Sequence, residues 1–456
     1  MIENLFSAKV QAAAPLFVRV ILMAHTEIVS PKLLIVKKFG GTSVGTPERI
    51  CAVAQLIANS LSQGNQVVAV VSAMAGETNR LVGLAHAIHS MPWGLEYDML
   101  LAAGEQQSVA LLALALKSIG VKAEPLLAHQ VGIRTDSLYS KARIKNIDTE
   151  KLRRFLEEGT VPVIAGFQGV DETDHITTLG RGGSDTSAVA LAAALGADDC
   201  EIYTDVEGIY TTDPRLCPKA TKLNEICYEE MIELASLGAK VMQIRSVELA
   251  AKYRVPLHVR SSFSNVSGTR IVGETTAMED ILVSGVAADS DCARITLKNL
   301  PDATETLVGV FGPIANAGVV VDIIVQNRME DRTIKVSFTV SEVEARKVKA
   351  FIEEELVRVF PQLEVEMELG LGKVSVVGVG MRNHPGVAAK AFAVLADIGV
   401  AISLIATSEI KISMVVTRSA LRKCVERLHE AFGLNEKENP IKPPPGDLLE
   451  HHSTMS

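Results

Sequence analysis

Residues 178–187 have the sequence TLGRGGSDTS and run directly into the apolar segment AVALAAAL at 188–195. The glycines predict a loop, and the apolar segment predicts a helix over 185–195 that the loop opens. The amide groups and dipole at the start of such a helix attract an anion, and Ser184 or Asp185 is suited to cap it. Arg181 offers a forked donor for a carboxylate. A plain helix cap needs neither three glycines nor an arginine, so the pattern favours a binding loop.

The surrounding sequence alternates short apolar runs with longer helical segments. We expect buried strands at 33–36, 67–71, 161–165, 201–204 and 257–260, and helices at 47–61, 79–89, 97–119, 185–195 and 229–253. This alternation predicts an α/β fold, with a mostly parallel sheet that helices cover. Ligands of such sheets bind beyond the carboxyl ends of the strands, so the loops that follow strands are the candidate sites.

The composition is that of a globular protein with more than one domain. The chain has 456 residues, of which 48% are hydrophobic and 22% are charged. This length predicts two or three domains, and the apolar content excludes dominant disorder. The net charge of -9 argues against non-specific binding to nucleic acid or to an anionic membrane. No uninterrupted apolar run approaches the ~20 residues of a membrane helix, and the six cysteines form no CxxC pair.

Two further loops follow predicted strands. The first strand ends in KKFGGTS at 37–43, where paired glycines let backbone amides approach an anion and Lys38 supplies a positive charge. The alternative is a tight turn beside a solvated lysine. The strand at 201–204 is followed by DVEGIYTTDPR at 205–215. There Asp205 is placed to contact a ribose or a metal-bound water, and Tyr210 to stack on a base; a series of Asx-capped turns is the alternative.

Two weaker signals are single side chains. Glu105 follows Gly104 within the predicted helix 97–119, among apolar neighbours. A buried glutamate is costly unless it has a partner or a function, although an exposed helix glutamate is the commoner case. Lys240 ends the sequence GAK at 238–240, which on its own indicates a solvated lysine. The chain lacks the P-loop, the dinucleotide fingerprint and the HExxH, HRD and GxSxG motifs.

Beyond a polar stretch at 268–280, the pattern changes to two shorter units of similar order. The first has strands at 283–287, 293–297, 319–326 and 333–340 and helices at 305–317 and 341–359. The second has strands at 363–369, 373–377, 401–405 and 410–416 and helices at 386–398 and 418–432. IANAGVVV at 314–321 and LADIGVAI at 395–402 hold the same place in each. The chain therefore contains two copies of a βαββαβ module. Residues 1–31 are expected to be a flexible extension, with Met1 or Met23 as the start, and 436–456 a disordered tail.

Taken together and in this order, the loops resemble the motifs of the aspartate kinases, in the amino-acid kinase family. KFGGTS at 38–43, GRGGSD at 180–185, the segment 204–215 and GAKV at 238–241 carry the resemblance, which covers nearly all of 32–435. The two C-terminal units resemble ACT domains, which sense amino acids. The resemblance implies an amino-acid-kinase-like αβα sandwich over 32–267, a linker at 268–280, and ferredoxin-like ACT domains at 281–360 and 361–435.

The resemblance implies phosphoryl transfer from MgATP to the β-carboxylate of L-aspartate, in the cytoplasm, as the first step of lysine, threonine and methionine biosynthesis. A carboxylate nucleophile is already ionised at pH 7, which agrees with the lack of a Ser-His-Asp arrangement. Catalysis would then rest on positioning and charge neutralisation. Magnesium is expected to be held mainly by ATP oxygens and water, so no metal site made of protein side chains is expected.

The resemblance also implies roles for individual residues. Those implied to be catalytic are Lys38, Asp185 and Lys240. Those implied to bind ATP are Lys38, Phe39, Gly40, Gly41, Thr204, Asp205, Tyr210, Arg215, Lys240 and Val241. Those implied to bind aspartate are Thr78, Glu105, Arg181, Gly182, Gly183 and Ser184, with Arg181 on a carboxylate and Glu105 on the ammonium group. Those implied to bind a regulatory effector are Asp322, Gln326 and Asn327.

The regulatory half departs from the family pattern at one turn. ACT domains carry a Pro-Gly turn before their first helix, and HPGVA at 384–388 keeps it in the second copy. The first copy has NLPDATE at 299–305 instead, which leaves effector binding at that turn open. We expect a homodimer or larger oligomer through the ACT domains, inhibited by lysine, threonine or both. An internal start near 278–280 would add a separate regulatory subunit.

Two alternatives remain at this stage. One is a kinase of the same superfamily that acts on another acid, such as glutamate or acetylglutamate. The other is a non-catalytic amino-acid sensor that has kept the fold. The paired ACT domains and the segment 238–241 argue against the first. The joint presence of Lys38, Arg181, Asp205 and Lys240 argues against the second.

Overall fold

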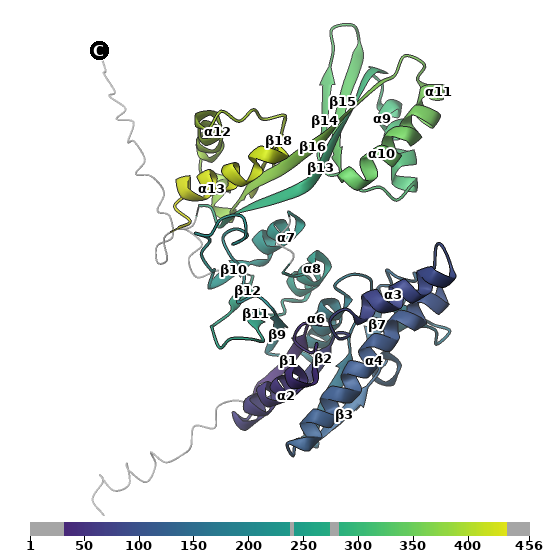
Figure 1. Cartoon of the computed structure of the whole chain (residues 1–456), viewed down its shortest axis with the longest axis vertical. Helices are drawn as coiled ribbons and strands as arrows, with labels where there is room; N and C mark the ends of the chain where they lie inside the picture. Colours follow the sequence, from purple (N-terminus) through teal and green to yellow (C-terminus); the bar gives the residue numbers. More distant parts are fainter. Residues whose placement is uncertain (1–31, 238–240, 274–281, 436–456) are drawn as a thin grey trace, which may run out of the picture.

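The computed structural model describes residues 32–237, 241–273 and 282–435. Figure 1 shows two parts, an α/β part from the N-terminal two thirds of the chain and a C-terminal part in which helices pack on long strands. The expected extension (1–31), Lys240, the suggested start at 278–280 and the expected tail (436–456) lie outside the described residues.

An eight-stranded sheet forms the centre of the α/β part. Its order is β10–β12–β11–β9–β1–β2–β6–β3. The strands are β1 (Leu34–Phe39), β2 (Gln66–Val71), β3 (Ala123–Leu126), β6 (Val161–Ala165), β9 (Asp199–Thr204), β10 (Glu225–Cys227), β11 (Leu257–Ser261) and β12 (Thr269–Val272). Neighbouring strands run parallel except β11 and β12. The prediction of a mostly parallel sheet is confirmed.

Helices cover both faces of this sheet. On one face α2 (Pro47–Ser62) and α4 (Leu95–Ser118) form an apolar cluster with strand residues such as Val71. On the other face α5 (Glu150–Glu157), α6 (Gly183–Leu195), α7 (Tyr228–Ser236) and α8 (Ile244–Tyr253) pack on residues such as Val36 and Ile202. Successive residues of a strand point to opposite faces, so each central strand contributes to both clusters. This arrangement is the expected αβα sandwich.

Three details of the α/β part differ from the prediction. The single helix expected at 229–253 is two helices, α7 and α8. The linker expected at 268–280 is wrong for Thr269–Val272, which form β12 of the central sheet. A four-stranded sheet was not predicted; its order is β5–β4–β7–β8, from Ile144–Ile147, Ile133–Thr135, Gln168–Val170 and Ile176–Thr178. Strands of three or four residues are too short to give a recognisable alternation.

The C-terminal part is built on one antiparallel sheet of six strands, in the order β14–β15–β13–β16–β18–β17. Its strands are β13 (Gly285–Pro301), β14 (Ile324–Arg328), β15 (Thr333–Val340), β16 (Glu364–Val377), β17 (Leu404–Thr407) and β18 (Lys411–Thr417). Its helices are α9 (Thr304–Asn316), α10 (Glu342–Phe351), α12 (Val387–Asp397) and α13 (Leu421–Ala431), with a short α11 (Val357–Val359) that follows a π-helical turn. Figure 1 shows β13 and β16 running side by side through both halves of this part.

The two modules are interleaved rather than successive. The strand pairs expected at 283–287 with 293–297, and at 363–369 with 373–377, are each one continuous strand, β13 and β16. Val283 and Val286 belong to the apolar core that contains α12 and α13, whereas Ile295 and Leu297 belong to the core that contains α9 and α10. The division at 360/361 therefore does not separate the two cores, because the start of β13 completes the second module.

The second module rests on the α/β part through α7 and the loop that follows β9. Val286 N–H donates to the carbonyl of Thr211 (2.8 Å), and the Thr211 hydroxyl lies 2.8 Å from Nε2 of the buried His429. Glu230 of α7 accepts from the backbone of Val379 (3.0 Å). The six-stranded sheet is thus bonded directly to a loop of the α/β part.

Among the described residues, one helix, α4, is long and apolar enough to cross a membrane. Half of its most apolar window is buried inside the protein, and Leu112 and Leu116 are wholly buried against the central sheet. The apolar character of α4 is therefore explained by its place in the core.

Candidate active site

The loops that follow β1, β2, β6, β9 and β11 meet at the carboxyl ends of the strands of the central sheet. Gly40 N–H donates to Tyr203 O (3.1 Å), Gly166 N–H to Val71 O (3.0 Å) and Ser262 N–H to Thr204 O (3.0 Å). These bonds continue the sheet by one residue beyond its strands and hold the loops together. Gly40 and Gly41, Arg181 and Gly182, and the segment 205–215 lie in these loops or in the loop that opens α6.

Lys38 and Asp185 form an ion pair among these loops. Their side chains, from β1 and the first turn of α6, are 11% and 10% exposed, and Lys38 Nζ lies 2.6 Å from Asp185 Oδ1. The two atoms are close but do not have the angles of a hydrogen bond, and Asp185 Oδ1 has no hydrogen-bond partner among the described residues. A buried ammonium held by charge alone is free to turn toward a second anion.

The neighbouring Lys37 belongs to a separate cluster on the other face of β1. Lys37 and Arg260 both pair with Glu201, and Tyr203 OH donates to it (3.1 Å). Ligand atoms of Asp199, Glu201 and His258 lie within 4.8 Å of one another. The two cations already neutralise Glu201, so this cluster is an ion-pair network rather than a metal site.

The paired glycines after β1 allow a close approach of the loop that follows β2. A Cβ atom on Gly41 would lie 2.8 Å from the carbonyl oxygen of Ala73, and Ala75 N–H donates to Gly41 O (3.1 Å). A Cβ on Gly40 would lie 3.5 Å from Lys38 Nζ. A side chain at position 41 would therefore push the two loops apart.

Glu105 lies on the buried side of α4 and points at the loop that follows β2. Its Oε1 accepts from Ala73 N–H (2.9 Å), whereas the buried Oε2 has no partner among the described residues. Burial raises the pKa of this carboxyl to about 7, and the bond from Ala73 opposes the shift. An unpartnered buried carboxylate oxygen is costly, and a ligand ammonium group would supply the missing partner.

The loop before α6 presents Arg181 at the protein surface. Arg181 is exposed and forms no hydrogen bond or ion pair with another described residue. Gly182 is the N-cap, with φ of +69°, and a Cβ there would lie 2.4 Å from Gln243 Cβ. The prediction that Ser184 or Asp185 caps α6 is wrong, because the helix begins at Gly183 and both residues lie buried in its first turn.

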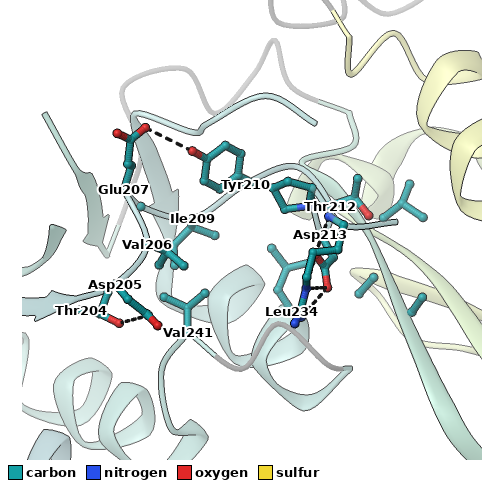
Figure 2. Close-up of a pocket in the computed structure, with 16 residues that line it drawn as sticks. Thr204, Asp205, Val206, Glu207, Ile209, Tyr210, Thr212, Asp213, Leu234 and Val241 are labelled. Carbon is teal, nitrogen blue, oxygen red and sulfur yellow. Dashed lines mark hydrogen bonds and ion pairs between the residues drawn. The ribbon is translucent and has the colours of Figure 1, made fainter. Parts of the chain in front are cut away.

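A cavity of about 610 Å³ lies beside these loops, as Figure 2 shows. Thr204, Asp205, Tyr210, Arg215 and Val241 line it. Val241 points toward Val206 from the opposite side, so the inner end of the cavity is apolar. The far wall is formed by Val286, Ala287 and Ala288 of β13. The six-stranded sheet therefore borders this cavity.

Two polar side chains of the cavity are already engaged. The Tyr210 hydroxyl lies 3.5 Å from Glu207 Oε2. Arg215 donates to both carboxylate oxygens of Asp213, at 2.7 to 3.1 Å, and its side chain is 87% exposed. Asp213 takes the Nε and Nη2 donors of Arg215, and Nη1 makes no hydrogen bond with a described residue, so a second anion is able to bind there.

The remaining predicted residues lie farther from this centre. Phe39 is wholly buried and stacks on Tyr203 with 4.9 Å between ring centroids, so its side chain belongs to the core. Thr78 lies half-buried in the first turns of α3 (Glu77–Ile88). Asp322 pairs with Lys373, and Gln326 and Asn327 are exposed on the edge strand β14.

Two comparisons with known proteins identify the family. Residues 33–261 match the model of the amino acid kinase family, and residues 374–432 match an ACT domain. The chain is 47% identical over 409 residues to the aspartokinase of Geobacillus stearothermophilus, which covers 90% of this chain and 99% of the relative. The chain belongs to the aspartate kinases. The match to the ACT domain falls on the second module, in which β16, β18 and α13 lie.

Solved aspartate kinases have the same fold. E. coli aspartokinase III in complex with aspartate and ADP, in the R-state, has a TM-score of 0.74 and 26% identity, over 88% of this chain and 100% of that one. The same enzyme in complex with lysine and aspartate, in the T-state, has a TM-score of 0.70 and 27% identity, over 87% of this chain and 99% of that one. This aspartate kinase therefore has both the catalytic and the regulatory parts of its relatives.

Sequence analysis missed several residues that shape the site. Asp98 of α4 bonds to the backbone before the Arg181 loop, Asp213 holds Arg215, and the Thr211–His429 contact joins the two parts of the chain. Asp98 precedes Glu105 by seven residues. Since residues seven apart share a helix face, this spacing was a usable signal. The other two contacts depend on residues that are distant in the sequence or lie in a turn.

Proposed function

We propose that this aspartate kinase transfers the γ-phosphoryl group of ATP to the β-carboxylate of L-aspartate, giving ADP and 4-phospho-L-aspartate. The observation that supports this most strongly is the buried Lys38–Asp185 pair, which places a cation among the loops that follow the strands. One of these loops, 204–215, lines the cavity. The E. coli aspartokinase III structure with aspartate and ADP supports the choice of substrates.

Lys38 is the residue that stabilises the transferring phosphoryl group in this proposal. The charge on a phosphoryl group spreads over its oxygens during transfer, and a fixed cation lowers the barrier. Asp185 orients the lysine, and the amides at Gly40 and Gly41 add donors beside it. The carboxylate of aspartate needs no base because it is ionised at neutral pH.

Glu105 and Arg181 hold the amino-acid substrate in this proposal. The free Oε2 of Glu105 is the partner of the substrate ammonium, and the unengaged guanidinium of Arg181 is the partner of a carboxylate. Gly182, Gly183 and Ser184 shape the loop, and Thr78 lies on the α3 side. The β-carboxylate is then left to face Lys38.

ATP occupies the cavity of Figure 2 in this proposal, with Asp205, Tyr210 and Val241 beside it. The oxygen groups there that suit a hard cation are the carboxylates of Asp205, Glu207 and Asp213 and the hydroxyl of Thr204. Thr204 donates to Asp205 (3.1 Å), Glu207 lies beside Tyr210, and Asp213 is paired with Arg215. That donor set fits a magnesium ion carried in by the nucleotide rather than a protein cage. When bound, the ion neutralises phosphate charge.

Regulation by lysine, threonine or both through the ACT modules is part of the proposal. The T-state complex of E. coli aspartokinase III with lysine supports it, as does the direct bonding of the regulatory sheet to Thr211. The open edge strands β14 and β17 favour pairing with a second copy. We place the enzyme in the cytoplasm. A separate regulatory subunit stays a prediction.

A coupled assay of ADP release with a panel of amino acids tests the proposal. The panel contains aspartate, glutamate and acetylglutamate, with ATP and magnesium in excess. We expect release with aspartate and at most a trace with the other two. Release with glutamate or acetylglutamate instead would identify a different kinase. If no amino acid promotes release while aspartate still binds by calorimetry, the chain acts as a sensor.

A further inference from the structure

Asp98 is a buried carboxylate whose bonds all lead to the glycine-rich loop or its neighbour. It is wholly buried in the first turn of α4. Its Oδ2 accepts from Thr178 N–H (2.6 Å) and from Ser140 N–H (2.9 Å), and its Oδ1 accepts from the Ser140 hydroxyl (2.9 Å). Three bonds to one buried carboxylate fix both segments relative to α4.

The two segments that Asp98 holds are themselves joined. Ala142 N–H donates to Thr178 O (2.9 Å), and a Cβ on Gly180 would lie 2.8 Å from Ser140 O. Ser140 has a φ of +64°, a left-handed conformation that is unfavourable for serine and that its bonds to Asp98 stabilise. Thr178 is three residues before Arg181, so Asp98 anchors the base of the loop that presents this arginine.

The same helix carries Glu105, seven residues beyond Asp98. Seven residues are two turns of an α-helix, about 10 Å along its axis, and both side chains are buried on the inner side of α4. Glu105 bonds to Ala73 after β2, and Asp98 bonds to Thr178 before Arg181. A single rigid element therefore sets the spacing between the end of β2 and the Arg181 loop.

We propose that Asp98 is a positioning residue that fixes the distance between Glu105 and Arg181, and thereby the affinity for the amino-acid substrate. The inference rests on the proposed function, in which these two side chains bind the ammonium and a carboxylate of aspartate. Arg181 is exposed and has no hydrogen bond or ion pair with another described residue, so its position follows that of the loop. The cavity proposed for ATP is lined by residues of 204–215 and of β13, and the bonds of Asp98 go to Ser140 and Thr178, which do not line it.

The test compares Asp98→Ala with wild type in steady-state kinetics and in calorimetric titration with aspartate. We expect the KM and the Kd for aspartate to rise about tenfold or more, since a bidentate contact is lost when its guanidinium is displaced. The KM for ATP should stay within about twofold, since a one-ångström displacement acts locally. Asp98→Asn, which keeps one oxygen for the two backbone donors, should restore a near-normal KM for aspartate.

Asp171→Ala is the matched control. Asp171 is also buried and accepts bonds from Thr173 N–H, the Thr173 hydroxyl and His175 N–H, in the turn between β7 and β8, and a longer one (3.5 Å) from the Tyr139 hydroxyl. It lies at the opposite end of β8 from Thr178. Asp171→Ala should lower the melting temperature as Asp98→Ala does, but it should leave the KM for aspartate unchanged.

The outcomes separate this inference from the proposed function. Wild type without aspartate-dependent turnover would overturn the proposed function. An active wild type together with an unchanged aspartate KM in Asp98→Ala, or an equal rise in both KM values, would overturn the positioning role. If Asp98→Ala does not fold, Ser140→Ala carries the test, because it removes one of the three bonds. It should raise the aspartate KM about twofold to threefold, and an unchanged value would overturn the role.

Discussion

Lys38 Nζ lies 2.6 Å from Asp185 Oδ1, and the two side chains are about one-tenth exposed. The pair joins the first strand of the central sheet to the helix that the glycine-rich loop opens. Removing one partner of a buried ion pair leaves the other charge uncompensated, which destabilises a protein strongly. Any test of Lys38 must therefore separate a loss of catalysis from a loss of folding.

Lys38→Met is expected to lower kcat by a factor on the order of 100 or more, because the cation that stabilises the transferring phosphoryl group is gone. Steady-state kinetics at saturating ATP and aspartate measure this. Lys37→Met is the matched control, since Lys37 is also buried and also pairs with a carboxylate, that of Glu201, on the other face of β1. It should lower the melting temperature similarly and leave kcat within about threefold. Near-normal kcat in Lys38→Met would exclude the assigned role.

Arg181→Lys is expected to raise the KM for aspartate about tenfold and to leave the KM for ATP nearly unchanged. The substitution keeps the charge but loses the forked pair of donors. Because Arg181 is exposed and forms no hydrogen bond or ion pair with another described residue, the melting temperature should not change. A rise of both KM values by the same factor would mean that Arg181 supports the loop instead of the substrate.

Aspartate binding should weaken as pH falls below 7. Burial raises the pKa of Glu105 to about 7, and only its ionised form attracts the substrate ammonium group. The KM for aspartate at pH 6 should be about ten times that at pH 8, as the ionised fraction falls from about nine tenths to about one tenth. A profile of kcat/KM against pH measures this. Glu105→Gln should bind aspartate weakly at every pH and show no such step.

Glu105 should also make the enzyme less stable as pH rises. Its folded-state pKa is above its ordinary value, so the folded chain binds more protons than the unfolded chain between about pH 4.5 and pH 7. The unfolding free energy should fall across this window by about 3 kcal/mol at most. Glu105→Gln should be more stable than wild type at pH 8, by about 1 to 3 kcal/mol, and similar at pH 4.5. Urea unfolding at the two pH values checks this, and equal stability at pH 8 would contradict it.

Asn327→Ala should weaken feedback inhibition and leave the uninhibited kcat nearly unchanged. Asn327 is exposed on the edge strand β14, remote from the Lys38–Asp185 pair. Rates with lysine, threonine and both together, across effector concentrations, measure the effect. Full inhibition of the variant at unchanged concentrations would place the effector site elsewhere.

The chemistry-bearing loops could be predicted because each follows directly on a strand. Lys38, Gly41 and Arg181 are recognisable from residue types within a few positions, and the parallel sheet brings their loops to one edge. The contacts that align these loops could not be predicted in the same way. Asp98 bonds to Thr178, eighty residues away, and a buried helix aspartate has the same local sequence as an exposed one.

The interleaving of the regulatory modules shows a second limit. Polar residues at 289–291 indicate a loop between two strands, but the structure carries β13 through this point by shifts of register around Cys292. Pairing with β16 along its whole length stabilises the continuous strand, and this pairing spans about eighty residues of sequence. Local patterns report which residues form strands, whereas bulges depend on the partner strand.

Trapping of the product with hydroxylamine tests the central claim most directly. An acyl phosphate reacts with hydroxylamine to give a hydroxamate, and mass spectrometry identifies which carboxylate carried it. With ATP, magnesium and aspartate we predict the β-hydroxamate of aspartate in an amount equal to the ADP released, and none with the Lys38→Met enzyme. ADP release without hydroxamate, or a hydroxamate on the α-carboxylate, would contradict phosphoryl transfer to the β-carboxylate.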